Sequence, residues 1–140
     1  ALTHVLEMSN ISVLTNRAGA NLLNGLASLL VTHVTLEGEL KHKAIIFEVD
    51  ENSLPLVLKE IPNPSAIVLL NLFRDQLDRY GEVNSTAEKW KKSFQILSDK
   101  TMVIANADDP LVAYIAGYAK SKTYFSIDIK RFSLNKKAIV

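Results

Sequence analysis

Polar side chains, most of them acids and amides, follow four of the apolar runs in this sequence, at the points where strands would end. If the runs are parallel strands of one open sheet, their carboxyl ends meet at one edge, where loops converge and ligands bind. Helix N-termini at that edge would add N–H groups that favour anions. Loops are polar in most proteins and such residues also cap helices, so a structural role is the alternative for each single cluster. The side chains are, run by run, Thr15, Asn16, Arg17 and Asn21; Glu48, Asp50, Glu51 and Asn52; Asn71, Arg74, Asp75, Gln76, Asp78 and Arg79; and Asn106, Asp108 and Asp109.

Glu48 lies within an apolar run, between Phe47 and Val49. A carboxylate buried there without a partner would be costly, so the sequence predicts a cation or strong hydrogen-bond donors beside it. A hard metal ion would meet this need. An ion pair with Arg74 or Arg79 is the structural alternative.

Two further polar segments could bind a ligand. In the segment NADDP, residues 106–110, the Asn106 amide precedes a helix that Asp109 caps and Pro110 opens. An amide at that place can hydrogen-bond a heterocycle or a phosphate, although it is also an ordinary cap. The segment NLFRDQLDRYG, residues 71–81, is dense in acids and bases, for which ion pairs between residues i and i+4 are the structural explanation.

The apolar runs alternate with longer segments of helical spacing, and residues 35–43 predict a surface loop or small hairpin. The alternation predicts an α/β fold, a doubly wound and mostly parallel sheet with right-handed crossovers and flanking helices. We expect Trp90 to turn inward and Leu111, Ile115 and Tyr118 to face the core. The expected strands are residues 11–14, 44–49, 66–70, 101–105 and 123–127, three of them buried, and the expected helices are residues 18–33, 53–60, 85–97 and 110–119, after a first helix at the beginning of the chain.

Composition restricts the class of protein. The 140 residues, 48% hydrophobic and 22% charged, predict one globular domain read as a single unit, residues 1–140. A net charge of +1 gives no electrostatic reason to bind nucleic acid, and the apolar stretch at residues 22–34 is too short to cross a membrane. The sequence has no Cys, which excludes a disulfide or a thiolate zinc site, and His4, His33 and His42 are too scattered to predict a histidine metal site.

The two ends of the sequence suggest a piece of a longer protein. Ala1 stands where Met would be expected, and Leu2, Val5 and Leu6 already have helical spacing without a capping residue before them. At the other end, residues 138–140 resemble the start of a buried strand. We therefore expect the chain to be truncated before the first strand of its sheet.

Four segments, in this order and spacing, resemble the central ATPase domain of the Mur ligase superfamily: TNRAGANLLNG at 15–25, FEVDE at 47–51, NLFRDQLDRYGE at 71–82 and NADDP at 106–110. Gln76, where the common motif has His, favours the MurT-type ligase subunits of lipid II isoglutaminyl synthases. The resemblance implies ATP-dependent activation of the α-carboxylate of D-glutamate in lipid II as an acyl phosphate. Ammonia would then attack to form D-isoglutamine. It also implies a cytoplasmic enzyme that uses ATP and Mg²⁺ and receives ammonia from a GatD-like glutaminase subunit.

The resemblance also assigns roles to single residues. Glu48 matches the glutamate that coordinates the catalytic Mg²⁺, and Asn106 matches the asparagine that contacts adenine, with Asp109 framing that edge. Asn16 and Asn21 match the loop that faces the substrate. Many of these ligases need a carbamylated lysine further along the chain, for which Lys89 and Lys91 are candidates that the resemblance does not separate.

The glycine-rich loop GxxxxGK[ST], with which the superfamily holds ATP phosphates, does not occur in these 140 residues. In the family it lies just before the helix with which this chain begins. The C-terminal ligase domain and the cysteine zinc ribbon of the MurT type are missing as well. Two functional classes are therefore expected: part of an ATP-dependent amide ligase, inactive by itself, or a non-catalytic nucleotide-binding or assembly module of the same fold.

Overall fold

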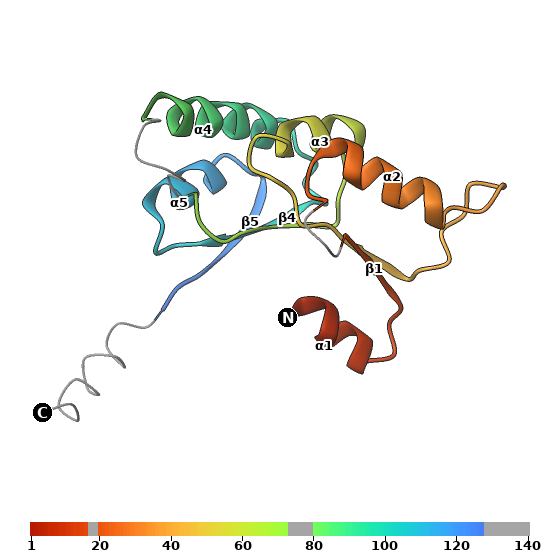
Figure 1. Ribbon diagram of the computed structural model, residues 1–140. Helices are drawn as coiled ribbons and strands as arrows, with labels where there is room; N and C mark the ends of the chain where they lie inside the picture. Colours follow the sequence, from red (N-terminus) through yellow and green to blue (C-terminus); the bar gives the residue numbers. More distant parts are fainter. Residues whose placement is uncertain (17–19, 73–79, 128–140) are drawn as a thin grey trace, which may run out of the picture. The chain divides into compact units, whose positions relative to one another are not determined.

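The structure is a computed structural model that describes residues 1–16, 20–72 and 80–127 (Figure 1). The chain forms two compact units, residues 1–57 and residues 58–140. Both units have α/β architecture with parallel strands, as the alternation in the sequence predicts. That all 140 residues act as one domain stays a prediction.

The first unit contains a two-stranded parallel sheet. Strands β1 (Val13–Thr15) and β2 (Ala44–Ile46) pair with Thr15 opposite Ile46 at their last position. Leu14 of β1 and Leu26 of the connecting helix are 4% and 2% exposed. The helices of this unit are α1 (Leu2–Met8), α2 (Leu23–His33) and the beginning of α3 (Leu54–Glu60), which crosses the boundary between the units.

The second unit contains a three-stranded parallel sheet in the order β3-β4-β5. Strand–helix alternation along the chain produces this order, because each strand joins its parallel neighbour through a crossover helix. Helix α4 packs against α5, and α5 packs against β4. The elements are β3 (Ala66–Leu69), α4 (Tyr80–Gln95), β4 (Met102–Asn106), α5 (Pro110–Ala116) and β5 (Ser121–Phe125).

Burial alternates along the strands of the second unit. Val103 and Ala105 of β4 are fully buried, whereas Met102 at the start of the same strand is 38% exposed. In β3, Leu69 is buried and Val68 is 47% exposed. An apolar run without polar residues therefore does not produce a strand that is buried on both faces, because the alternate side chains of β3 remain exposed.

The core beside α4 and α5 follows the helical spacing only in part. Trp90 turns inward as predicted, and its ring stacks on that of the fully buried Phe94 at a centroid distance of 6.2 Å. Ile115 is also fully buried. Tyr118, which we expected to face the core, is only half buried because it lies beyond the end of α5, in the turn that follows.

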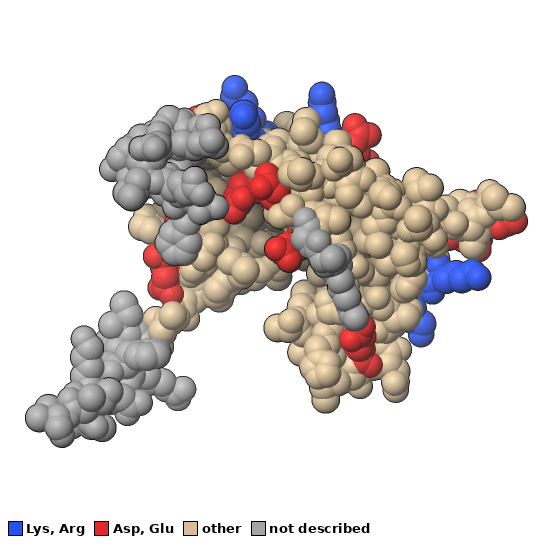
Figure 2. Space-filling model, in the orientation of Figure 1, with Lys and Arg blue, Asp and Glu red and all other residues tan. Residues whose placement is uncertain are grey.

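The small hairpin expected within residues 35–43 is present. A single antiparallel bridge joins Val34 to Leu40, and Gly38 has a φ of +84°, which makes the expected small hairpin. On the face shown in Figure 2, Lys and Arg side chains of the described residues stand in small separate groups. None of the helices described is both long and apolar enough to span a membrane.

Candidate functional site

In the first unit, the side chain of Asn16 joins the ends of the two strands. Its Oδ1 accepts a hydrogen bond from the backbone N–H of Glu48 at 2.9 Å, and its Nδ2 donates to the carbonyl oxygen of Glu48 at 2.7 Å. Nδ2 also donates to the carbonyl oxygen of Ala20 at 2.9 Å. Asn16 is 6% exposed, so its amide is buried and its polar atoms are satisfied by backbone groups.

A second contact joins the same two loops. The backbone N–H of Asp50 donates to the carbonyl oxygen of Asn21 at 3.0 Å. The Asp50 carboxylate accepts a hydrogen bond from the N–H of Asn52 at 2.9 Å, which is a local turn. The structure therefore brings Asn16 and Asn21, predicted on one loop, next to Glu48 and Asp50, predicted on the other.

Glu48 differs from its predicted environment. Strand β2 ends at Ile46, and Glu48 follows in irregular chain as an exposed residue. The burial argument for a cation is therefore wrong, since the apolar run continues past the strand that it was expected to form. Its assignment as a metal ligand stays a prediction, and the alternative partners Arg74 and Arg79 lie outside the described residues.

The position of Glu48 nevertheless suits one kind of metal site. Among the residues that the structure describes, no three His, Cys, Asp or Glu side chains are grouped so that they could hold a metal ion. Protein Mg²⁺ sites that act on nucleotides often use one or two carboxylates, and phosphates and waters supply the other oxygens. A single exposed carboxylate on a backbone fixed by Asn16 fits such a site.

In the second unit, Asp109 has two structural tasks. Its Oδ1 accepts hydrogen bonds from the N–H groups of Leu111 and Val112 at 2.9 and 3.0 Å, which caps α5 as the sequence predicts. Its Oδ2 accepts a hydrogen bond from the N–H of Leu72 at 2.8 Å. Asp109 therefore ties the loop after β3 to the loop after β4, a contact over 37 residues that no local pattern indicates.

Asn106, at the end of β4, is half buried. Its Oδ1 accepts a hydrogen bond from the N–H of Asp108 at 3.0 Å, which orients the amide. Within the described part of the chain, no hydrogen bond is found for its Nδ2 group. The contact of this amide with a heterocycle stays a prediction.

The four polar loops are found in pairs. The loops after β1 and β2 meet in the first unit, and those after β3 and β4 meet in the second. That all four loops meet at one edge stays a prediction. The motif residue Gln76 and most of the third loop lie outside the described residues.

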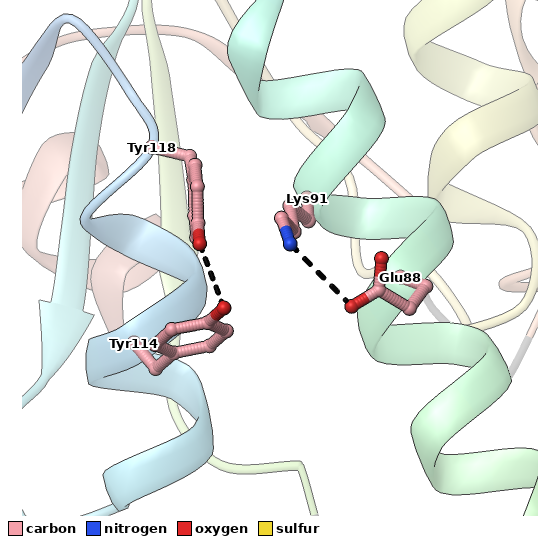
Figure 3. Close-up of polar contacts among 4 residues, drawn as sticks. All are labelled: Glu88, Lys91, Tyr114 and Tyr118. Carbon is pink, nitrogen blue, oxygen red and sulfur yellow. Dashed lines mark hydrogen bonds and ion pairs between the residues drawn. The ribbon is translucent and has the colours of Figure 1, made fainter.

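The two candidate lysines of α4 differ in their surroundings. Lys91 lies near two tyrosines that follow one another at i, i+4 (Figure 3). Its ammonium nitrogen is 4.8 Å from the ring centroid of Tyr118 and 3.6 Å from a carboxylate oxygen of Glu88. Lys89 is exposed.

These contacts favour the charged form of Lys91, and the choice between Lys89 and Lys91 as a carbamylated residue stays a prediction. Desolvation lowers the pKa of Lys91, but its contacts with Tyr118 and Glu88 outweigh this effect and raise the pKa above its ordinary value. Carbamylation requires the neutral amine, and this environment favours the ammonium. The hydroxyl of Tyr118 also donates to that of Tyr114 at 2.7 Å, a pair that the i, i+4 spacing could have indicated.

A cleft that the sequence did not predict lies between the end of α2 and the hairpin. The imidazole rings of His33 and His42 are 5.6 Å apart, and Nδ1 of His42 is buried without a hydrogen bond in the described structure. Two imidazoles beside a lysine are fewer ligands than a closed metal site needs. The cleft encloses about 300 Å³ and is lined by Thr32, His33, Val34, Thr35, Lys41 and His42.

Comparison with known proteins agrees with the motifs. The family described as Mur ligase middle domain matches residues 2–139. The MurT subunit of lipid II isoglutaminyl synthase (glutamine-hydrolyzing) from Staphylococcus aureus is 34% identical over 125 residues, which is 89% of this chain and 27% of the relative. The MurT subunit from Streptococcus pneumoniae is 35% identical over 120 residues, 85% of this chain and 26% of the relative.

A more distant relative covers half of the chain. The UDP-N-acetylmuramate–L-alanine ligase of Caldicellulosiruptor saccharolyticus is 33% identical over 69 residues, which is 49% of this chain and 15% of the relative. The chain spans about a quarter of the length of the MurT relatives.

Proposed function

Because this chain belongs to the Mur ligase middle-domain family, we propose that it is the central part of an ATP-dependent amide ligase of peptidoglycan synthesis. The similarity to two MurT subunits over at least 85% of the chain carries the proposal. The similarity to the alanine ligase is shorter, and this favours the isoglutaminyl synthase over an amino-acid-adding ligase.

The proposed reaction has two steps. In the first, an oxygen of the D-glutamate α-carboxylate of lipid II attacks the γ-phosphorus of ATP, and ADP leaves. In the second, ammonia attacks the carbonyl carbon of the acyl phosphate, inorganic phosphate leaves, and a proton is lost to give the amide of D-isoglutamine. The words "glutamine-hydrolyzing" and "subunit" in the names of the relatives support a glutaminase partner of the GatD type as the source of ammonia.

The described residues support a division of tasks between the two units. Glu48 provides the carboxylate for Mg²⁺, which neutralises phosphate charge and polarises the transferred group when it is bound. Asn106 directs its Nδ2 group to adenine. Asp109 holds the loop that contains Asn106 in place through its hydrogen bond with the N–H of Leu72. Asn21 lies on the loop proposed to face the substrate, next to Asp50.

The glycine-rich phosphate loop is absent from these 140 residues, so the test uses the protein as its gene encodes it, with its glutaminase partner. Amidation of lipid II is measured by mass spectrometry with ATP, Mg²⁺ and glutamine. Glu48→Gln keeps the size of the side chain and removes its charge, and we expect turnover to fall by orders of magnitude. The matched control is Glu51→Gln on the same loop, for which we expect a much smaller effect.

The outcomes separate the two functional classes. If the wild-type protein binds ATP but amidates no lipid II with glutamine or ammonium, the non-catalytic module is the better description. If it amidates lipid II and Glu48→Gln is as active as Glu51→Gln, the ligase is correct and the metal ligand is misplaced.

A further inference from the structure

The Asn16 side chain continues the pairing of β1 and β2 past the end of the strands. The last backbone pair of the parallel ladder is Thr15 with Ile46. Beyond it, the side-chain amide of Asn16 hydrogen-bonds both backbone groups of a single residue, Glu48. Its Oδ1 accepts from the N–H of Glu48 at 2.9 Å, and its Nδ2 donates to the C=O of Glu48 at 2.7 Å. A primary amide carries the same donor and acceptor as a peptide group, so it can replace a neighbouring strand at this place.

We propose that Asn16 is a positioning residue that fixes the backbone of Glu48 and thereby directs its carboxylate toward Mg²⁺. The proposal rests on the proposed function, because it takes Glu48 as the metal ligand. Glu48 is exposed and follows the end of β2 in irregular chain, so among the described residues neither strand pairing nor core packing holds its side chain. With both backbone groups held by one rigid amide, the direction of its Cα–Cβ bond is set.

The hydrogen-bond inventory of Asn16 distinguishes positioning from direct substrate contact. Its amide has two N–H donors, and these are used on the carbonyl oxygens of Glu48 and Ala20. The residue is 6% exposed. A substrate that took a hydrogen bond from Asn16 would have to displace one of these backbone acceptors and leave a partly buried carbonyl unpaired.

A separate contact keeps the two loops together when Asn16 is changed. The N–H of Asp50 donates to the carbonyl oxygen of Asn21 at 3.0 Å, and neither group belongs to Asn16 or Glu48. The ladder from Val13 to Thr15 is also independent of the Asn16 side chain. We therefore expect a variant at Asn16 to fold while the Glu48 backbone becomes free to move.

The experiment measures metal binding apart from turnover. Mn²⁺ serves as the probe, and its binding to the protein as its gene encodes it is followed by electron paramagnetic resonance with a non-hydrolysable ATP analogue. Asn16→Ala removes the amide without adding charge, and Asn16→Ser can replace at most one of the lost hydrogen bonds. The control is Asn24→Ala, since Asn24 is exposed and its amide oxygen accepts only from the adjacent N–H of Gly25, at 2.9 Å, in the described structure.

Changing a residue that orients a metal ligand commonly costs about 10–100-fold in metal affinity. We expect a weakening of about that size for Asn16→Ala, a smaller one for Asn16→Ser and none for Asn24→Ala. The Mg²⁺ concentration for half-maximal lipid II amidation should rise in parallel, while the KM for lipid II stays unchanged.

Three results would overturn the proposal. Wild-type Mn²⁺ affinity in Asn16→Ala and Asn16→Ser would show that Glu48 needs no support. A raised KM for lipid II with unchanged metal affinity would make Asn16 a substrate contact, and a lower unfolding midpoint with all other values unchanged would make it purely structural. Unchanged Mn²⁺ binding in Glu48→Gln is a different failure, because it refutes the metal assignment on which the proposal rests.

Discussion

Asp109 offers a prediction whose size follows from its three accepted hydrogen bonds. Asp109→Ala removes the cap of α5, which costs about 0.5–2 kcal/mol at typical N-caps. It also leaves the N–H of Leu72 without its acceptor, and a buried unpaired donor costs about 1–3 kcal/mol. Leu72 is 7% exposed, so water cannot easily replace the carboxylate. The expected loss of local stability is about 1.5–5 kcal/mol if the two contributions add.

Asp109→Asn separates the two contributions. The amide oxygen can still accept from Leu111 and Val112, but the NH₂ group then faces the N–H of Leu72, where no hydrogen bond can form. We expect the cap to survive and the tie between the loops to be lost. Asp99→Ala, at an exposed position in the turn after α4, is the control.

Hydrogen exchange followed by mass spectrometry reads both places in the protein as its gene encodes it. A loss of about 1–3 kcal/mol accelerates exchange by about 5- to 150-fold. In Asp109→Asn the peptide that contains Leu72 should exchange faster and the first turn of α5 should not, whereas in Asp109→Ala both should. Wild-type exchange at Leu72 in both variants would refute the reasoning, because it would show that the 2.8 Å contact does not protect that amide.

Two further predictions concern α4 and α5. The hydrogen bond from Tyr118 and the charge of Lys91 lower the pKa of Tyr114, although desolvation raises it. Tyr118→Phe should therefore raise the pKa of Tyr114. An NMR titration that finds an unchanged or lower pKa would contradict this. Phe94→Ala empties a fully buried site and should cost about 3–5 kcal/mol of unfolding free energy, against less than about 0.5 kcal/mol for Ile96→Ala at an 83% exposed position. Urea unfolding followed by circular dichroism compares these two, and equal midpoints would show that Phe94 does not belong to the core.

Local features of the sequence were sufficient to predict the fold class and the N-cap of α5. Strand–helix alternation predicts parallel strands because a crossover needs a helix, and the structure has parallel strands in both units. Asp109 before Pro110 predicts the N-terminus of α5, since the capping bonds reach only two and three residues along the chain. The four motifs were sufficient to indicate the family because each is a short continuous segment, which can be recognised without the tertiary structure.

The end of β2 shows where local patterns fail. Apolar residues continue to Val49, but the ladder with β1 stops at Ile46, so Glu48 is exposed although its neighbours in sequence are apolar. Pairing with another strand decides where a strand ends, and the apolar run itself carries no record of its partner's length. In the same way, helical spacing predicts that Tyr118 faces the core, but α5 ends at Ala116, before Tyr118.

The tasks of Asn16 and Asp109 depended on tertiary structure. Asn16 was predicted from its loop, but its partner Glu48 is 32 residues away, and Asp109 reaches Leu72 over 37 residues. The sequence by itself determined which residue types stand at the ends of the strands and which family the motifs resemble. Tertiary structure alone decided which of these side chains form hydrogen bonds with backbone groups of a distant loop. A hydrogen bond forms between groups that folding brings within about 3 Å, whatever their separation along the chain.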